Sequence, residues 1–124
     1  MQRDVVVVSG VRTAIGDFGG ALKDFSPTDL GARVVREALS RAHVAGDEVG
    51  HVVFGNVVHT EPRDMYLARV AALDGGVTQH APALTVNRLC GSGLQAIVSA
   101  AQSILLGDAD VAIGGGAENM IRAA

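Results

Sequence analysis

Short apolar runs alternate with longer amphipathic segments along the 124 residues of the chain. Four runs, at residues 4–10, 51–58, 83–88 and 109–114, are short and rich in valine, isoleucine, leucine and alanine. Continuous apolar runs of this length, bounded by glycine, proline or polar residues, are typical of strands that are buried on both faces of a sheet. The pattern therefore predicts four strands in an enclosed sheet.

Three segments between these runs repeat their apolar residues at helical spacing. Residues 28–43 carry most of their arginines on the opposite face, and Thr28 is the expected N-cap. Residues 62–74 begin with Pro62, which suits a first helical turn, and end before a glycine pair. The third predicted helix covers residues 91–106.

The order of these elements is β-α-β-α-β-α-β. Each connection between strands is long enough to hold a helix, so we expect an α/β fold with a mainly parallel sheet and right-handed crossovers. No repeat, linker or low-complexity segment interrupts residues 1–124, which are read as one layered unit.

The third predicted helix indicates that this unit needs a further covering layer. No charged residue occurs between Gly91 and Gly107, and apolar side chains surround most of the helix, namely Leu94, Ile97, Val98, Ala101, Ile104 and Leu105. A sheet covers only one side of a helix, so an all-round apolar helix requires a second partner. No helix follows the last strand either. We therefore expect another subunit or more polypeptide to complete the fold.

Composition and charge exclude several classes of protein. Apolar residues make up 48% of the chain and charged residues only 19%, which favours a globular core over disorder. The net charge is -3 and the 10 lysines and arginines form no cluster, so no nucleic-acid partner is expected. No run reaches the length of a membrane span or signal peptide. A single cysteine cannot form an internal disulfide, which favours a reducing, cytoplasmic location.

That single cysteine is the main candidate for chemistry. Cys90 stands in VNRLCGSGLQ, just past the carboxyl end of a predicted strand and at the start of a predicted helix. Open α/β sheets bind ligands at this edge, and a helix N-terminus favours a nearby anion. Gly91 and Gly93 permit a tight turn and close approach by a substrate. The layout predicts a nucleophile whose neighbouring backbone N–H groups stabilise an oxyanion.

Two considerations compete with that interpretation. A lone cysteine is often a small buried apolar residue. A helix N-terminus stabilises a thiolate by only about 0.3–1 kcal/mol, so a working nucleophile also needs a base. Of four histidines, only His59 follows a strand and so lies at the same sheet edge as Cys90. A solvated loop histidine is the preferred interpretation of His59, so the sequence supplies a candidate nucleophile without a convincing base.

Other candidates carry weaker signals. The segment GGGAE at residues 114–118 lacks the spacing of a dinucleotide-binding loop and is read as a tight turn. One cysteine and dispersed histidines make no metal site. Met65 and Tyr66 are interpreted as packing or subunit-contact residues. Glu118 is either a cap or a buried acid.

Three segments in order resemble the thiolases, the acetyl-CoA C-acyltransferases. The segment VNRLCGSGLQAI resembles the nucleophile segment of thiolases. The segment SGVRTAIGDFGGALKD, at residues 9–24, resembles the stretch that follows their first strand. The segment GDADVAIGGGAENM, at residues 107–120, resembles the end of their fourth strand. GNVVHTEPRDMYLARVAALDGGV is most similar to bacterial β-ketothiolases of broad chain-length range, which serve polyhydroxyalkanoate synthesis. The resemblance covers nearly the whole chain.

The resemblance implies a mechanism in which Cys90 accepts an acyl group from acetyl-CoA or a 3-ketoacyl-CoA, with its own N–H in an oxyanion hole. It implies no cofactor beyond the acyl-CoA substrate, a homodimer or homotetramer, and a five-layered fold. Residues 1–124 correspond to the N-terminal part of a thiolase N-terminal domain, without the loop domain and C-terminal domain. The activating histidine and second cysteine have no counterpart here, so the chain alone is expected to be inactive.

Two other functions stay open at this point. The chain could be a non-catalytic module that pairs its exposed helix and sheet with a second copy. It could also belong to a related cysteine-dependent ketoacyl synthase, although NRLCGSGLQAI is more similar to thiolases.

Overall fold

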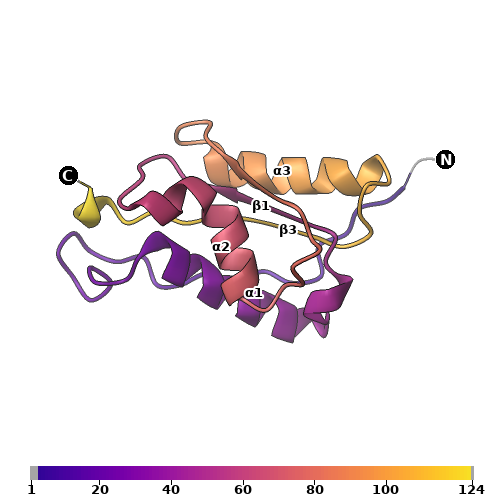
Figure 1. The fold of residues 1–124 in the computed structure, drawn as a ribbon, viewed down its shortest axis with the longest axis horizontal. Coiled ribbons are helices and arrows are strands. Elements are labelled where there is room, and N and C mark those ends of the chain that lie inside the picture. The colour runs from indigo at the N-terminus through magenta and orange to yellow at the C-terminus, as the bar shows by residue number, and fades with distance from the viewer. Residues whose placement is uncertain (1–2, 124) are drawn as a thin grey trace.

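The computed structural model describes residues 3–123 as three parallel strands with helices on both faces (Figure 1). The helices are α1 (Pro27–Ala42), α2 (Leu67–Asp74) and α3 (Ser92–Leu105), and the strands are β1 (His51–Gly55), β2 (Ala83–Val86) and β3 (Ala112–Gly116). Short 3-10 helices cover Gly46–Glu48, Pro62–Tyr66 and Met120–Arg122. The predicted α/β class and the parallel sheet are confirmed.

The strand order is β2-β1-β3, with both neighbours parallel to the central strand β1. Phe54 of β1 stands opposite Thr85 of β2 and Gly115 of β3. Because all three strands run the same way, their carboxyl ends meet at one edge of the sheet. That edge holds the loops that follow Gly55, Val86 and Gly116.

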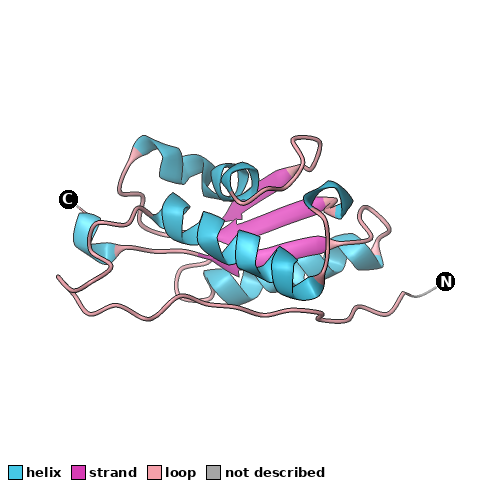
Figure 2. Cartoon of the chain, turned by 90° about the horizontal axis from the view of Figure 1, so that it is seen from below, coloured by secondary structure: helices cyan, strands magenta, loops and turns pink. Residues whose placement is uncertain are grey.

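The helices form two layers around the sheet. Helices α1 and α2 lie together on one face and α3 lies alone on the other (Figures 1 and 2). The larger core cluster joins α1, α2 and the sheet, and it includes the fully buried Val35, Phe54 and Leu67. A smaller cluster joins α3 to the sheet through Val53, Ala96 and Ala100. The three-layer arrangement explains why β1 is apolar on both faces.

The predicted first strand, residues 4–10, is wrong for this structure. The segment forms no strand, and no backbone hydrogen bond joins residues 3–16 to any sheet strand. Val6, Val7 and Val8 are 73%, 85% and 66% exposed. β-Branched composition favours an extended backbone, but a strand also requires a neighbour with which to form a ladder. The valine run has the composition of a strand, but within residues 3–123 no strand pairs with it.

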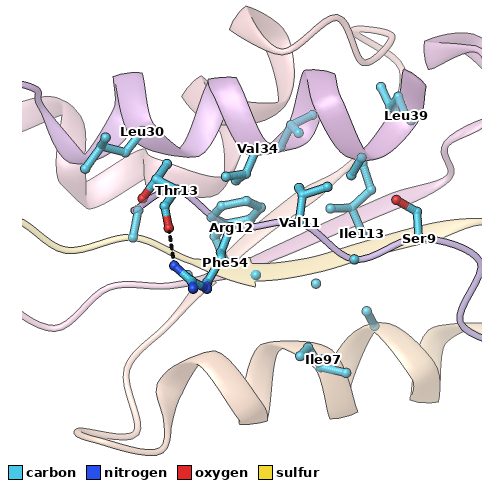
Figure 3. A pocket seen from close by; sticks show the side chains of 18 of the residues that line it. Ser9, Val11, Arg12, Thr13, Leu30, Val34, Leu39, Phe54, Ile97 and Ile113 are labelled. Atoms are coloured by element: carbon cyan, nitrogen blue, oxygen red, sulfur yellow. Dashed lines mark hydrogen bonds between the residues drawn. The ribbon is translucent and has the colours of Figure 1, made fainter. Parts of the chain in front are cut away.

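A cavity of about 850 Å³ separates this N-terminal segment from the sheet edge at β3 (Figure 3). Leu30, Val34 and Leu39 of α1 face it from one side and Ile97 of α3 from the other. Arg3 anchors the start of the segment by donating to the carbonyl oxygens of Ile104 and Ala109 at 2.9 and 3.2 Å. Cys90 does not line this cavity, so the cavity is separate from the candidate chemistry.

The start of α1 also differs from the prediction. Ser26, not Thr28, is the N-cap, and its hydroxyl accepts a hydrogen bond from the Asp29 N–H at 3.1 Å. Pro27 occupies the first helical position, where a missing N–H costs nothing. Thr28 is fully buried, with its hydroxyl 3.0 Å from that of Ser26. The polar residue before the proline therefore caps the helix.

The glycines at residues 114–116 belong to strand β3, so the predicted tight turn is wrong. A Cβ on Gly114 would lie 2.7 Å from Ile97 Cα, and one on Gly115 would lie 2.9 Å from the Phe54 ring. The glycines allow α3 and the Phe54 ring to lie directly on the strand. They are required by packing, which local turn signals do not reveal.

Helix α3 is only half covered, as its composition predicted. Ala96 and Ala100 are buried against the sheet, whereas Leu94, Ile97 and Val98 are 70%, 50% and 42% exposed. Within residues 3–123, no helix combines the length and apolar character required to cross a membrane.

Candidate active site

Cys90 lies at the carboxyl edge of the sheet, between the end of β2 at Val86 and the start of α3 at Ser92. It is a free, exposed cysteine. Gly91 is the N-cap of α3, so the thiol stands directly before the positive end of the helix dipole. Both placements agree with those expected from the sequence.

The turn that carries Cys90 has an unusual backbone. Leu89 adopts a φ of 50°, a left-handed conformation that is disfavoured for a branched side chain. The Asn87 side chain accepts a hydrogen bond from the Leu89 N–H at 3.0 Å, and the Gly91 N–H donates to the Arg88 carbonyl at 3.0 Å. Such a conformation persists when the surrounding contacts enforce it. The turn thus has the sharp bend of a nucleophile elbow.

The Cys90 N–H differs from those of its neighbours. The N–H groups of Leu89, Gly91 and Ser92 each have an acceptor within the turn, whereas the Cys90 N–H has none among the described residues. A free N–H beside a candidate nucleophile is the kind of donor that an oxyanion hole requires.

The turn rests on the end of the central strand. A Cβ on Gly55 would lie 2.7 Å from the carbonyl carbon and the Cβ of Ser92, and 2.8 Å from its carbonyl oxygen. Backbone atoms at this distance cannot give way as a flexible side chain does. Gly55 therefore determines how closely the start of α3 approaches the sheet.

Gly55→Ala is expected to lower the free energy of unfolding by about 1–3 kcal/mol, because the new methyl group forces the start of α3 away from β1. The measurement is the urea midpoint of the chain. Gly10→Ala is the matched control, since no atom lies within 4 Å of its Cβ position. An equal midpoint for both variants contradicts the prediction.

Polar groups connect the three strand ends beside this turn. Asn56 is buried, its N–H donates to Val86 O at 3.1 Å, and its amide donates to Ala117 O at 2.9 Å. Glu118 accepts hydrogen bonds from the N–H groups of Val57 and Val58, both at 2.9 Å. Glu118 is thus an exposed carboxylate that ties the loop after β1 to the end of β3.

The structure does not join His59 to Cys90. His59 could approach Cys90 only if strands β1 and β2 were neighbours, and they are. His59 is nevertheless exposed and makes no hydrogen bond to Cys90. His51 lies at the opposite edge, with its Nδ1 3.2 Å from Pro82 O. His43 ends α1 in a left-handed conformation. Within residues 3–123, no group of three or more acidic, histidine or cysteine side chains is arranged to hold a metal.

Met65 and Tyr66 lie in the short 3-10 helix before α2, with 51% and 62% of their surface exposed. Neither contributes to the turn around Cys90. Asp64, by contrast, is fully buried and accepts hydrogen bonds from Thr60 and Glu61, which fix the entry to this segment.

The structure is thus an α/β fold whose parallel sheet presents a cysteine at a helix N-terminus, directly before a glycine. The model of the thiolase N-terminal domain matches residues 5–124. The chain belongs to the thiolase family.

Relatives and solved structures agree with this membership. The chain is 80% identical over 123 residues to the β-ketothiolase BktB of Cupriavidus necator, covering 99% of the chain and 31% of that protein. It is 45% identical over 123 residues to the human mitochondrial 3-ketoacyl-CoA thiolase, again covering 99% of the chain and 31% of the relative. The crystal structure of the Bacillus anthracis acetyl-CoA acetyltransferase superposes with a TM-score of 0.93 at 39% identity, covering 99% of this chain and 31% of that one. The chain thus spans about a third of these proteins.

Sequence reasoning missed several residues that shape the site. Ser92 was not singled out from the sequence, although its buried hydroxyl lies inside the turn that carries Cys90. Asn56 follows a strand at the same edge as Cys90, and that position was the one signal that could have identified it.

Proposed function

We propose that this chain is the nucleophile-bearing part of an acyl-CoA acyltransferase that condenses or cleaves 3-ketoacyl-CoA through an acyl group on Cys90. The observation that carries the proposal is the turn itself. It places an exposed thiol at a helix N-terminus and leaves the adjoining Cys90 N–H without an acceptor among the described residues.

The reaction follows from these groups. Sγ of Cys90 bonds to the thioester carbon, and the carbonyl electron pair moves onto oxygen. The Cys90 N–H donates to that oxyanion, where a preorganised donor is most effective. The C–S bond to CoA then breaks, and CoA leaves as a thiol after taking up a proton. The thiol proton of Cys90 passes to a histidine that the family resemblance assigns outside these 124 residues.

Acyl-CoA is proposed as the substrate, with no cofactor beyond it. One solved structural neighbour, the human mitochondrial 3-ketoacyl-CoA thiolase, is a complex with CoA. We also propose a role in supplying polyhydroxyalkanoate precursors, in the cytoplasm, from the sequence resemblance to bacterial β-ketothiolases; a Cupriavidus necator relative carries that enzyme name. The uncovered face of α3 supports a homodimer or homotetramer.

The experiment uses a chimera in which this chain replaces the 123 aligned residues of the Cupriavidus necator relative. Incubation with acetyl-CoA, followed by acid quench and peptide mass spectrometry, is expected to find one acetyl group on the peptide that contains Cys90. The isolated 124-residue chain, assayed in parallel, is expected to acquire far less. An unmodified Cys90 in a folded chimera contradicts the proposal.

The exposed apolar face of α3 also favours a second candidate function, a non-catalytic module that self-associates. Measurements on the same chimera and on the isolated chain distinguish the acyltransferase from the self-associating module. Self-association of the isolated chain by size exclusion, combined with an unmodified Cys90 in the chimera, favours the module.

A further inference from the structure

One side chain contacts the Cys90 turn at two points. The buried Ser92 hydroxyl accepts a hydrogen bond from the Arg88 N–H at 2.8 Å and donates one to the Leu89 carbonyl at 2.7 Å. The Ser92 N–H donates to the same carbonyl at 3.1 Å. The Leu89 carbonyl oxygen therefore has two donors, both from Ser92.

This carbonyl belongs to the same peptide group as the Cys90 N–H. A peptide group is planar, and in its trans form the C=O and N–H bonds point in opposite directions. The described backbone has no cis peptide bonds. Two donors that hold the Leu89 oxygen toward the start of α3 consequently direct the Cys90 N–H away from the turn. This is the N–H that has no acceptor among residues 3–123.

We infer that Ser92 is a positioning residue for acyl transfer: its hydroxyl orients the peptide group between Leu89 and Cys90 so that the Cys90 N–H donates to the oxyanion. The inference rests on the proposed function. The hydroxyl also polarises the peptide group, because a donor on the carbonyl oxygen strengthens the N–H of the same group as a donor.

The conformation of Leu89 explains why the turn needs this hydroxyl. At a φ of 50° a leucine leaves the left-handed region readily unless it is held there. A rotation about the N–Cα bond of Leu89 that leaves this region carries the Leu89 carbonyl with it, and so turns the Cys90 N–H of the same peptide group away from the oxyanion. The Ser92 Oγ bond to the Leu89 carbonyl opposes that rotation directly.

The test compares two reactions of the same thiol in the chimera described above. Acylation by acetyl-CoA passes through an oxyanion, whereas alkylation by iodoacetamide displaces iodide and forms none. Ser92→Ala is expected to slow single-turnover acylation about tenfold to hundredfold, near the effect of weakening one oxyanion-hole donor, with little change in the alkylation rate. Ser103→Ala is the matched control, since Ser103 is a buried serine of the same helix that bonds to Ala100 O at 2.6 Å.

Each outcome decides the inference. A fall in the ratio of acylation to alkylation in Ser92→Ala, with an unchanged ratio in Ser103→Ala and in Ser92→Thr, supports it. Equal losses in both reactions, or no loss, overturn it and make Ser92 a purely structural residue. If Ser92→Ala does not fold, Ser92→Gly removes the same hydroxyl and the same ratio decides. A wild-type chimera that is not acylated at Cys90 refutes the proposed function instead.

Discussion

Cys90→Ser in the chimera is expected to reduce thiolysis of 3-ketoacyl-CoA by roughly 10⁴- to 10⁶-fold, the scale of removing an enzyme nucleophile. Serine keeps the size of the side chain, and the exposed position of Cys90 makes no demand on packing. The loss therefore reports chemistry alone. A hydroxyl at the helix N-terminus is far less acidic than a thiol and remains protonated.

The measurement is the steady-state rate of acetyl-CoA formation from acetoacetyl-CoA and CoA, with folding checked by circular dichroism. His59→Ala is the comparison variant, because an exposed histidine without a bond to Cys90 is expected to leave the rate unchanged. Thiolysis retained by Cys90→Ser would end the assignment of Cys90 as the nucleophile. A large loss in His59→Ala would show that this histidine acts in the reaction.

Phe54→Ala is expected to lower the free energy of unfolding by about 3–5 kcal/mol, the usual cost of deleting a buried phenylalanine. Phe54 is 1% exposed and belongs to the core cluster between the sheet, α1 and α2. Its ring lies against Gly31 and Gly115, which have no side chains that could move in to fill the cavity. The loss of unfolding free energy should therefore lie near the upper end of this range, at about 5 kcal/mol.

Urea denaturation of the chain, followed by far-UV circular dichroism, measures this change. Phe18→Ala is the control, because Phe18 is 83% exposed and its removal leaves the core intact. A midpoint for Phe54→Ala equal to that of Phe18→Ala would show that the ring does not hold the two layers together. Against a typical total stability of about 5–15 kcal/mol, the expected loss is large enough to unfold part of the population.

The sequence was informative where local pattern decides the structure. Apolar spacing located α1 and α3 to within one residue at each end, and the strand ends placed Cys90 at the carboxyl edge of the sheet. Those features depend on the periodicity of single segments, which the sequence displays directly. The position of Cys90 follows from them without any knowledge of tertiary contacts.

Where tertiary contacts decide, the pattern was insufficient. The valines at residues 5–8 have strand composition, but the sequence cannot show that no strand within residues 3–123 pairs with them. Gly114 suggests a turn until its closeness to Ile97 is seen. The two hydrogen bonds of Ser92 depend on the left-handed conformation of Leu89, which no residue type at that position signals.

The close seating of α3 on the sheet also has an evolutionary consequence. Gly55 and Gly114 each leave room for backbone of the helix that follows Cys90, at distances where even a methyl group would collide. A mutation that adds a side chain at either position therefore moves the helix, and with it Cys90. Sequence drift in these two strands is therefore coupled to the proposed acyl transfer, even though neither glycine contributes a reacting atom.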